Sequence, residues 1–255
     1  MQVPDLFPFQ NIMSSFFDDN LIWSPLTASG IDELSTKVDS HGLSIFGPMD
    51  YTHGYAYPLI VWLHSDFGNE AELLELMPML SLRNYVGLAP EGFHGCTAPS
   101  GENIAWPMTR VEETSERVYE AIRQVRYDYN INSARIFVAG RRSGGTMALW
   151  LALSNPGVFA GAASFDGLLP VMPRMFGQFR KQALQAFYLG VTANSLKAAP
   201  QRWYRDINLL NTSGISATYK EYRGSRQYEE DRDLLAEMMT DLNRWIMGQI
   251  SSRCI

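Results

Sequence analysis

Short apolar runs alternate with amphipathic stretches from Tyr57 to the C-terminus. The apolar runs and their turn-forming borders predict strands over residues 59–63, 84–90, 135–140, 161–165, 186–191 and 216–222. Between them, apolar residues recur at helical spacing, which predicts helices over residues 69–82, 110–129, 146–153, 201–211 and 231–250. Strands that alternate with helices in this way form β-α-β units. The pattern therefore predicts an α/β fold with a mostly parallel central sheet flanked by helices.

Two segments depart from this alternation. Residues 1–40 mix aromatic residues with turn formers and have no clear period, so we predict an N-terminal extension in front of a single domain at 41–255. Residues 91–109 are rich in Gly, Pro, Ser and Thr and predict a long loop. Loops of this length in compact domains are usually functional.

Composition narrows the class of protein. A formal net charge of -6 argues against a nucleic-acid binder, which would carry a basic face. The two cysteines, Cys96 and Cys254, make no disulfide framework. The N-terminus lacks a signal-peptide pattern, and no apolar run approaches the ~20 residues of a membrane span. We expect a soluble, cytoplasmic protein without a membrane span.

The few potential metal ligands are scattered along the chain. His94 and Cys96 share the long loop, but the four histidines and two cysteines show no metal-binding spacing. We therefore expect neither a metal nor a cofactor.

The most specific motif lies in residues 135–150. A predicted strand is followed by two glycines, Gly140 and Gly144, at the spacing of the G-x-S-x-G elbow that presents the nucleophile in α/β-hydrolases. The position of the serine holds Arg142. A guanidinium stays protonated and offers no lone pair, so it cannot attack an acyl carbon.

A second segment, residues 57–70, resembles the strand and oxyanion loop of the carboxylesterase, phospholipase and acyl-protein thioesterase branch of the α/β-hydrolases. His64 and Gly68 match the pattern of that branch, whereas Ser65 and Asp66 replace small glycines. Further similarity lies in GGTMAL (144–149) and FDGLLP (165–170), and the likeness extends from about Leu43 to the C-terminus. The resemblance implies an α/β-hydrolase fold.

Carried over residue by residue, the resemblance implies a degenerate catalytic triad. The nucleophile position falls on Arg142, the acid position on Asn194, and the base position on Arg226 or, one residue earlier, Ser225. In this fold the triad histidine follows the elbow. All four histidines of this chain precede it; they are His41, His53, His64 and His94.

The same resemblance implies oxyanion donors at the backbone amides of Ser65 or Asp66 and of Ser143. Together with Arg142 and Arg226 they would form a pocket for a carboxylate or phosphate. In the alternative interpretation Arg142 pairs internally with Asp166 or Asp66, because a buried, unpaired guanidinium is costly.

Three functions remain open. The first is a pseudoenzyme, a carboxylesterase-like protein that keeps the cleft and binds a small anionic or ester-like ligand in a regulatory or structural role. The alternative is a carboxylic-ester hydrolase with a rearranged site, in which Ser143 attacks with help from His64. One argument opposes this alternative. Ser143 follows the nucleophile position and starts the helix, so its side chain is expected to point away from the acyl pocket. The third is a structural subunit of a homo-oligomer.

Overall fold

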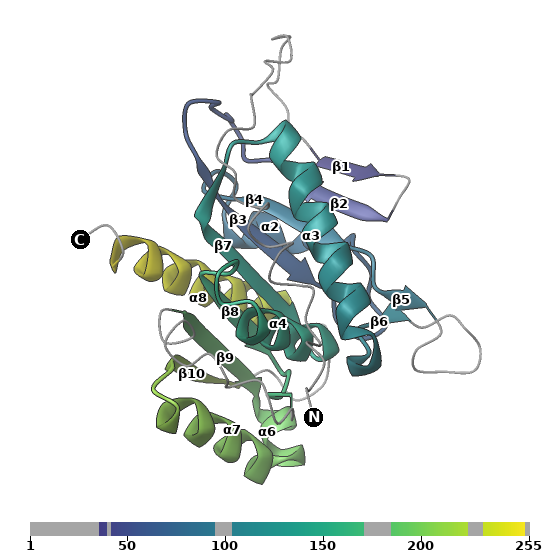
Figure 1. The fold of residues 1–255 in the computed structure, drawn as a ribbon. Helices are drawn as coiled ribbons and strands as arrows, with labels where there is room; N and C mark the ends of the chain where they lie inside the picture. The colour runs from purple at the N-terminus through teal and green to yellow at the C-terminus, as the bar shows by residue number, and fades with distance from the viewer. Residues whose placement is uncertain (1–35, 40–41, 95–103, 171–184, 224–231, 253–255) are drawn as a thin grey trace, which may run out of the picture. The chain divides into compact units, whose positions relative to one another are not determined.

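An eight-stranded sheet organises the protein, as the computed structural model in Figure 1 shows. The structure describes residues 36–39, 42–94, 104–170, 185–223 and 232–252, all within one compact unit, Asp32–Ile255. In sheet order the strands are β1 (Thr36–Asp39), β2 (Leu43–Phe46), β4 (Val86–Pro90), β3 (Tyr57–Leu63), β7 (Ile131–Arg141), β8 (Gly161–Phe165), β9 (Ala186–Thr192) and β10 (Ser216–Tyr222).

The sheet is mostly parallel, as predicted. All neighbouring pairs from β4 to β10 run parallel. Only the β1–β2 and β2–β4 pairs are antiparallel. Every residue of β3 is buried, as expected for a strand covered on both faces.

Helices cover the two faces of this sheet. Their bounds are α2 (Glu72–Leu80), α3 (Val111–Asp128), α4 (Ser143–Ser154), α6 (Ala193–Ala198), α7 (Pro200–Thr212) and α8 (Arg232–Ser252). In Figure 1, α3 and α4 lie in front of the sheet, and α2 and α8 lie behind it. No helix in the described ranges is long and apolar enough to cross a bilayer.

The structure differs from the sequence prediction at several element borders. The strand β1 lies within the predicted extension and pairs with β2, and neither short strand was predicted. The ends of the predicted loop 91–109 are ordered as β5 (Phe93–His94), β6 (Ile104–Ala105) and a 3-10 helix, η1 (Met108–Arg110). Residues 95–103 lie outside the described residues, and the division of the chain at residue 40 stays a prediction.

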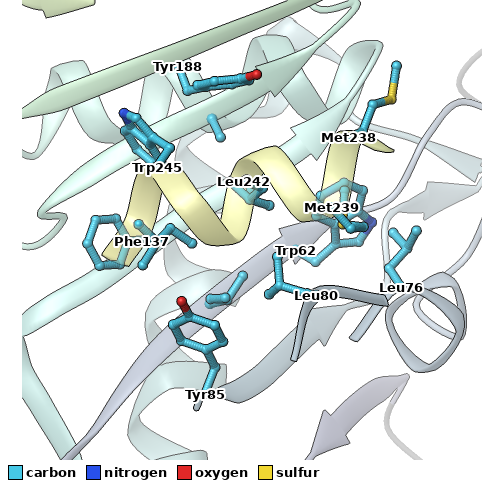
Figure 2. Close-up of a cluster of buried hydrophobic side chains, with 14 of the residues drawn as sticks. Trp62, Leu76, Leu80, Tyr85, Phe137, Tyr188, Met238, Met239, Leu242 and Trp245 are labelled. Carbon is cyan, nitrogen blue, oxygen red and sulfur yellow. The ribbon is translucent and has the colours of Figure 1, made fainter. Parts of the chain in front are cut away.

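The core behind the sheet is built around α8. Figure 2 shows this helix, in yellow, with Met239, Leu242 and Trp245 among side chains from the sheet and α2. The Trp245 ring centroid lies 5.8 Å from that of Phe137 and 5.9 Å from that of Tyr188. The closing helix is therefore an integral part of the fold.

We expect Leu242→Ala to lower the free energy of unfolding by about 2–5 kcal/mol, because it removes a buried side chain and leaves a cavity. Leu242 is 1% exposed, whereas Met247 on the same helix is 42% exposed. Met247→Ala is the matched control and should change stability by less than about 0.5 kcal/mol. Urea unfolding of both variants is the measurement, and equal losses would contradict this account of α8.

Candidate active-site cleft

The chain reverses its direction of winding between β3 and β7. From β3 it passes to β4 on one side of the sheet, and β7 then pairs with β3 on the other side. In open α/β sheets, ligands bind at such a switch point, outside the carboxyl ends of the strands. Here those ends lead into the predicted oxyanion loop and the predicted elbow.

The elbow itself is a sharp, strained turn. Arg142 has φ 53° and ψ -118°, a conformation that is uncommon for any residue other than glycine. Its backbone N–H donates to the carbonyl of Phe165 at 2.8 Å, and its carbonyl accepts from the N–H of Thr146 at 3.0 Å. The helix α4 starts directly afterwards at Ser143, three residues earlier than predicted.

Glycines make this turn possible. A Cβ atom on Gly144 would lie 2.2 Å from the carbonyl oxygen of Leu63, and one on Gly140 would lie 2.6 Å from the same atom. Both distances are far below van der Waals contact, so the first turn of α4 can pack against β3 only without these side chains. The spacing of the two glycines thus reflects a steric requirement of the turn.

A cleft of about 570 Å³ opens at the elbow. Four of its lining residues were singled out from the sequence: Asp66, Arg142, Ser143 and Asp166. Of the others, Thr146, Leu168, Leu169 and Pro170 belong to the two further motifs GGTMAL and FDGLLP, whereas Met108 and Arg202 were not singled out. Cavities of this size are typical of small-molecule sites.

The predicted oxyanion loop is tied down by a residue that was not predicted. The carboxylate of Glu72 accepts from the backbone N–H of Ser65 at 2.9 Å and from its hydroxyl at 3.2 Å. The amide of Ser65 is therefore committed inside the loop. Of the two amides expected to face an oxyanion from this loop, the Asp66 amide remains the candidate. The loop then turns, and the N–H of Gly68 donates to the carbonyl of Ser65 at 3.0 Å.

His64 is fully buried, and both its ring nitrogens are used within the protein. Its Nε2 accepts from the N–H of Gly92 at 3.0 Å, so Nδ1 carries the proton and donates to the carbonyl of Ser65 at 2.9 Å. In this arrangement the imidazole orients the loop between β4 and β5 relative to the loop after β3. It has no ring nitrogen left to deprotonate a serine.

Ser143 belongs to the lining of the cleft. Its Oγ accepts from the backbone N–H of Trp106 at 3.4 Å, and the ring of Trp106 lies 5.1 Å from that of His64. In the described part of the chain, no hydrogen bond joins His64 to Ser143. The structure does not join Ser143 and His64 into the pair that the alternative interpretation requires.

Of the remaining triad positions, only Asn194 belongs to the described residues. Asn194 is exposed and lies in α6, which begins directly after β9, rather than on an open turn. It does not belong to the lining of the cleft. Ser225 and Arg226 lie outside the described residues, as do His41 and Cys96.

Asp166 borders the cleft as expected, but its carboxylate has another role. Its Oδ1 accepts from the N–H of Thr192 at 2.7 Å and from the hydroxyl of Thr192 at 3.0 Å. No ion pair joins Arg142 to Asp166 or to Asp66 within the described ranges. Arg142 does have an interaction partner within the protein, so the internal pairing of its guanidinium stays a prediction.

The apolar residues 168–170 of the cleft lining are connected to α7 by a hydrogen bond. The N–H of Leu169 donates to Asp206 Oδ2 at 2.8 Å. Asp206 is 1% exposed and also accepts from the guanidinium of Arg205 at 2.7 Å. Because a buried carboxylate holds its backbone, the wall formed by residues 168–170 is preformed.

Comparison with known proteins finds one family model and several solved structures that are similar to this chain. A family model described as "Putative esterase" matches residues 120–223, which include the elbow. No curated protein sequence matches the chain. Three of the solved structures that resemble it share 12–19% sequence identity with it. SOBER1 of Arabidopsis thaliana has a TM-score of 0.58 at 19% identity, over 76% of this chain and 100% of that one.

The carboxylesterase of Bacillus cereus has a TM-score of 0.56 at 14% identity, over 76% of this chain and 89% of that one. The S-formylglutathione hydrolase FrmB of Staphylococcus aureus has a TM-score of 0.61 at 12% identity, over 87% and 99% of the two chains. The protein has the α/β-hydrolase fold, as its motifs predicted.

Protonation of His64 should destabilise the fold. Burial lowers the pKa of its imidazole below the ordinary value of 6.5, although the hydrogen bond to Ser65 and nearby carboxylates act in the opposite direction. Between the lowered folded pKa and 6.5, the unfolded chain binds the additional proton. The contribution of His64 to stability is therefore complete above about pH 6.5 and is lost as the pH falls toward the folded pKa.

We expect His64→Gln to remove this part of the pH dependence, because glutamine does not titrate. His53→Gln, at an exposed turn, should retain it. Urea unfolding at about pH 7.5 and about pH 5.5 measures the difference for each variant. Equal pH dependence in the two variants would contradict the assignment, and ring ¹⁵N chemical shifts of His64 in the unmodified protein test it without a substitution.

Proposed function

We propose that this protein does not hydrolyse esters and instead binds a small organic anion in the cleft at the elbow. The observation that carries the proposal is the position of Arg142. The strained turn that presents a serine in α/β-hydrolase esterases presents a guanidinium here. A group that stays protonated cannot act as a nucleophile, but it binds carboxylates and phosphates through paired hydrogen bonds.

The surroundings of Arg142 favour an anion. Its side chain stands at the N-terminus of α4, where the first N–H groups of a helix have no partner within the helix. The amides of Asp66 and Ser143 are the remaining candidates for the old oxyanion donors. In an esterase, backbone amides at these positions donate hydrogen bonds to the negative charge that develops in the transition state. A carboxylate carries a permanent negative charge and accepts the same hydrogen bonds.

The apolar residues of the cleft lining favour an apolar part in the ligand. Leu168, Leu169 and Pro170 line the cleft together with Met108. Pockets with an apolar wall and a few polar groups orient small molecules by their charged end. The ligand class that fits is a carboxylate with a short hydrocarbon part.

We expect Arg142→Gln to weaken binding of butanoate by about tenfold or more, because a hydrogen bond to a charged group contributes about 1.5–3 kcal/mol. Arg83→Gln is the matched control, since this arginine pairs with Asp50 at a solvent-exposed position outside the cleft. Isothermal titration calorimetry with acetate, butanoate and benzoate is the measurement. Binding that Arg142→Gln leaves unchanged would exclude the proposed site.

Ester hydrolysis through Ser143 is the second candidate. The match of residues 120–223 to an esterase family and the similarity to solved esterases favour it. Ser143 lines the cleft, but a nucleophilic serine needs a base. His64 could supply one only after releasing Gly92 or Ser65, its present hydrogen-bond partners.

A fluorophosphonate probe separates the two candidates. We expect no covalent labelling in intact-mass spectra, beside full labelling of an active esterase, because no base activates a serine here. Labelling that Ser143→Ala abolishes and Arg142→Ala leaves intact would establish the hydrolase and contradict our proposal. The same pair of variants distinguishes Ser143 from any other reactive serine.

A further inference from the structure

The imidazole of His64 connects two peptide groups, one at each of its ring nitrogens. Its Nε2 accepts from the N–H of Gly92 at 3.0 Å, and its Nδ1 donates to the carbonyl of Ser65 at 2.9 Å. The Gly92 N–H shares its peptide group with the Glu91 carbonyl, and the Ser65 carbonyl shares one with the N–H of the next residue. No peptide bond in the described ranges is cis, so the N–H and the C=O of each group point in opposite directions. The two peptides and the ring therefore form a continuous hydrogen-bond relay that ends at the N–H of Asp66.

A guanidinium stands at the other end of this relay. Nη1 of Arg117, on α3, donates to the carbonyl of Glu91 at 2.7 Å and to that of Gly92 at 2.9 Å. Its guanidinium carbon also lies 4.2 Å from the centroid of the buried Phe93 ring. A cation over an aromatic ring is attracted to it, so Arg117 contacts this loop through two different interactions. Arg117 therefore fixes the orientation of the peptide group between Glu91 and Gly92.

Every hydrogen bond of the relay is donated in the same direction, from the guanidinium toward the cleft. Arg117 donates to a carbonyl, the N–H of that peptide donates to His64, and His64 donates to the carbonyl of Ser65. Hydrogen bonds in such series polarise one another, and those from a charged donor are the strongest. The positive charge of Arg117 thus makes the N–H of Asp66, a residue of the cleft lining, a stronger donor.

We propose that Arg117 is a positioning residue for the loop after β3. It selects the tautomer of His64 in which Nδ1 is protonated, and it thereby sets the direction and the donor strength of the Asp66 amide, the candidate oxyanion donor. Arg117 does not belong to the cleft lining, so it acts there through the relay. The control of His64 holds whatever the cleft binds, whereas the effect on a bound anion rests on the proposed function.

Ring ¹⁵N chemical shifts of His64 test the relay without a ligand. We expect one tautomer, with Nδ1 protonated, in the unmodified protein and a mixture of both in Arg117→Met, because the Gly92 N–H is then no longer held toward Nε2. Amide hydrogen exchange of Gly92 should become about tenfold faster in this variant, as for the loss of a hydrogen bond to a charged group. Arg123→Met, on the same helix, is the matched control and should change neither quantity, since Arg123 pairs with Glu120 at an exposed position. A protonated Nε2 in the unmodified protein, or unchanged ring shifts in Arg117→Met, would overturn the relay.

A second variant separates the hydrogen bonds from the packing around Phe93. The guanidinium carbon of Arg110 lies 4.0 Å from the centroid of the same ring, but the side chain of Arg110 donates to Glu113. We expect Arg110→Met to leave His64 in a single tautomer. Mixed tautomers in both Arg110→Met and Arg117→Met would assign the effect to packing on the ring and contradict the relay.

Calorimetry with butanoate separates this inference from the proposed function. We expect Arg117→Met to weaken butanoate binding by about two- to fourfold, the share of a charged hydrogen bond that polarisation along the relay supplies. Unchanged affinity in a variant whose His64 tautomers are mixed would overturn the effect on the Asp66 amide. Absence of binding by the unmodified protein would overturn the proposed function, while the ring shifts of His64 still decide whether the relay exists.

Discussion

The close approach of α4 to β3 is the constraint on which the site depends. The first turn of α4 passes so near the carbonyl of Leu63 that neither Gly140 nor Gly144 could carry a side chain. The chain can enter the helix from β7 only through a sharp turn, and this turn forces Arg142 to a positive φ. A conformation of this kind costs about 1–3 kcal/mol, which the packing of α4 against β7 and β8 offsets.

This turn fixes a position, and the residue in that position decides the chemistry. Residue 142 stands at the N-terminus of α4 and lines the cleft. A serine there needs a base to become a nucleophile, whereas an arginine stays protonated and suits the anion binding that we propose. The loop after β3 is consistent with anion binding and not with catalysis by a serine. The imidazole of His64 and the carboxylate of Glu72 both form hydrogen bonds to Ser65, so neither is available as a base.

The fold was predictable where burial is complete. The strands β3, β4, β8 and β9 and the second half of β7 are apolar and buried, and the order of three motifs identified the α/β-hydrolase fold. The short strands β1 and β2 have no comparable apolar pattern in the sequence. The first turn of α4 was not predicted because it contains two glycines, and glycine is a poor helix former. Asp66, Arg142, Ser143 and Asp166 followed from the motifs. Glu72 and Arg202 reach the site through tertiary contacts between distant segments, and a single sequence carries no local signal for such contacts.

The arginine at this strained position raises the question of whether residue 142 has a role or only marks the loss of a catalytic site. Three residues with positive φ lie just after the carboxyl ends of β3, β7 and β8: Phe67, Arg142 and Asp166. If residue 142 had no role, glycine would adopt this turn without steric strain. Arginine adds to the strain the loss of about 2 kcal/mol of side-chain conformational entropy whenever its guanidinium is held in place. A favourable interaction must offset both costs. Arg142 already has an interaction partner within the protein, and the carboxylate that we propose would add to it at the position where the α/β-hydrolase elbow would otherwise place its nucleophile.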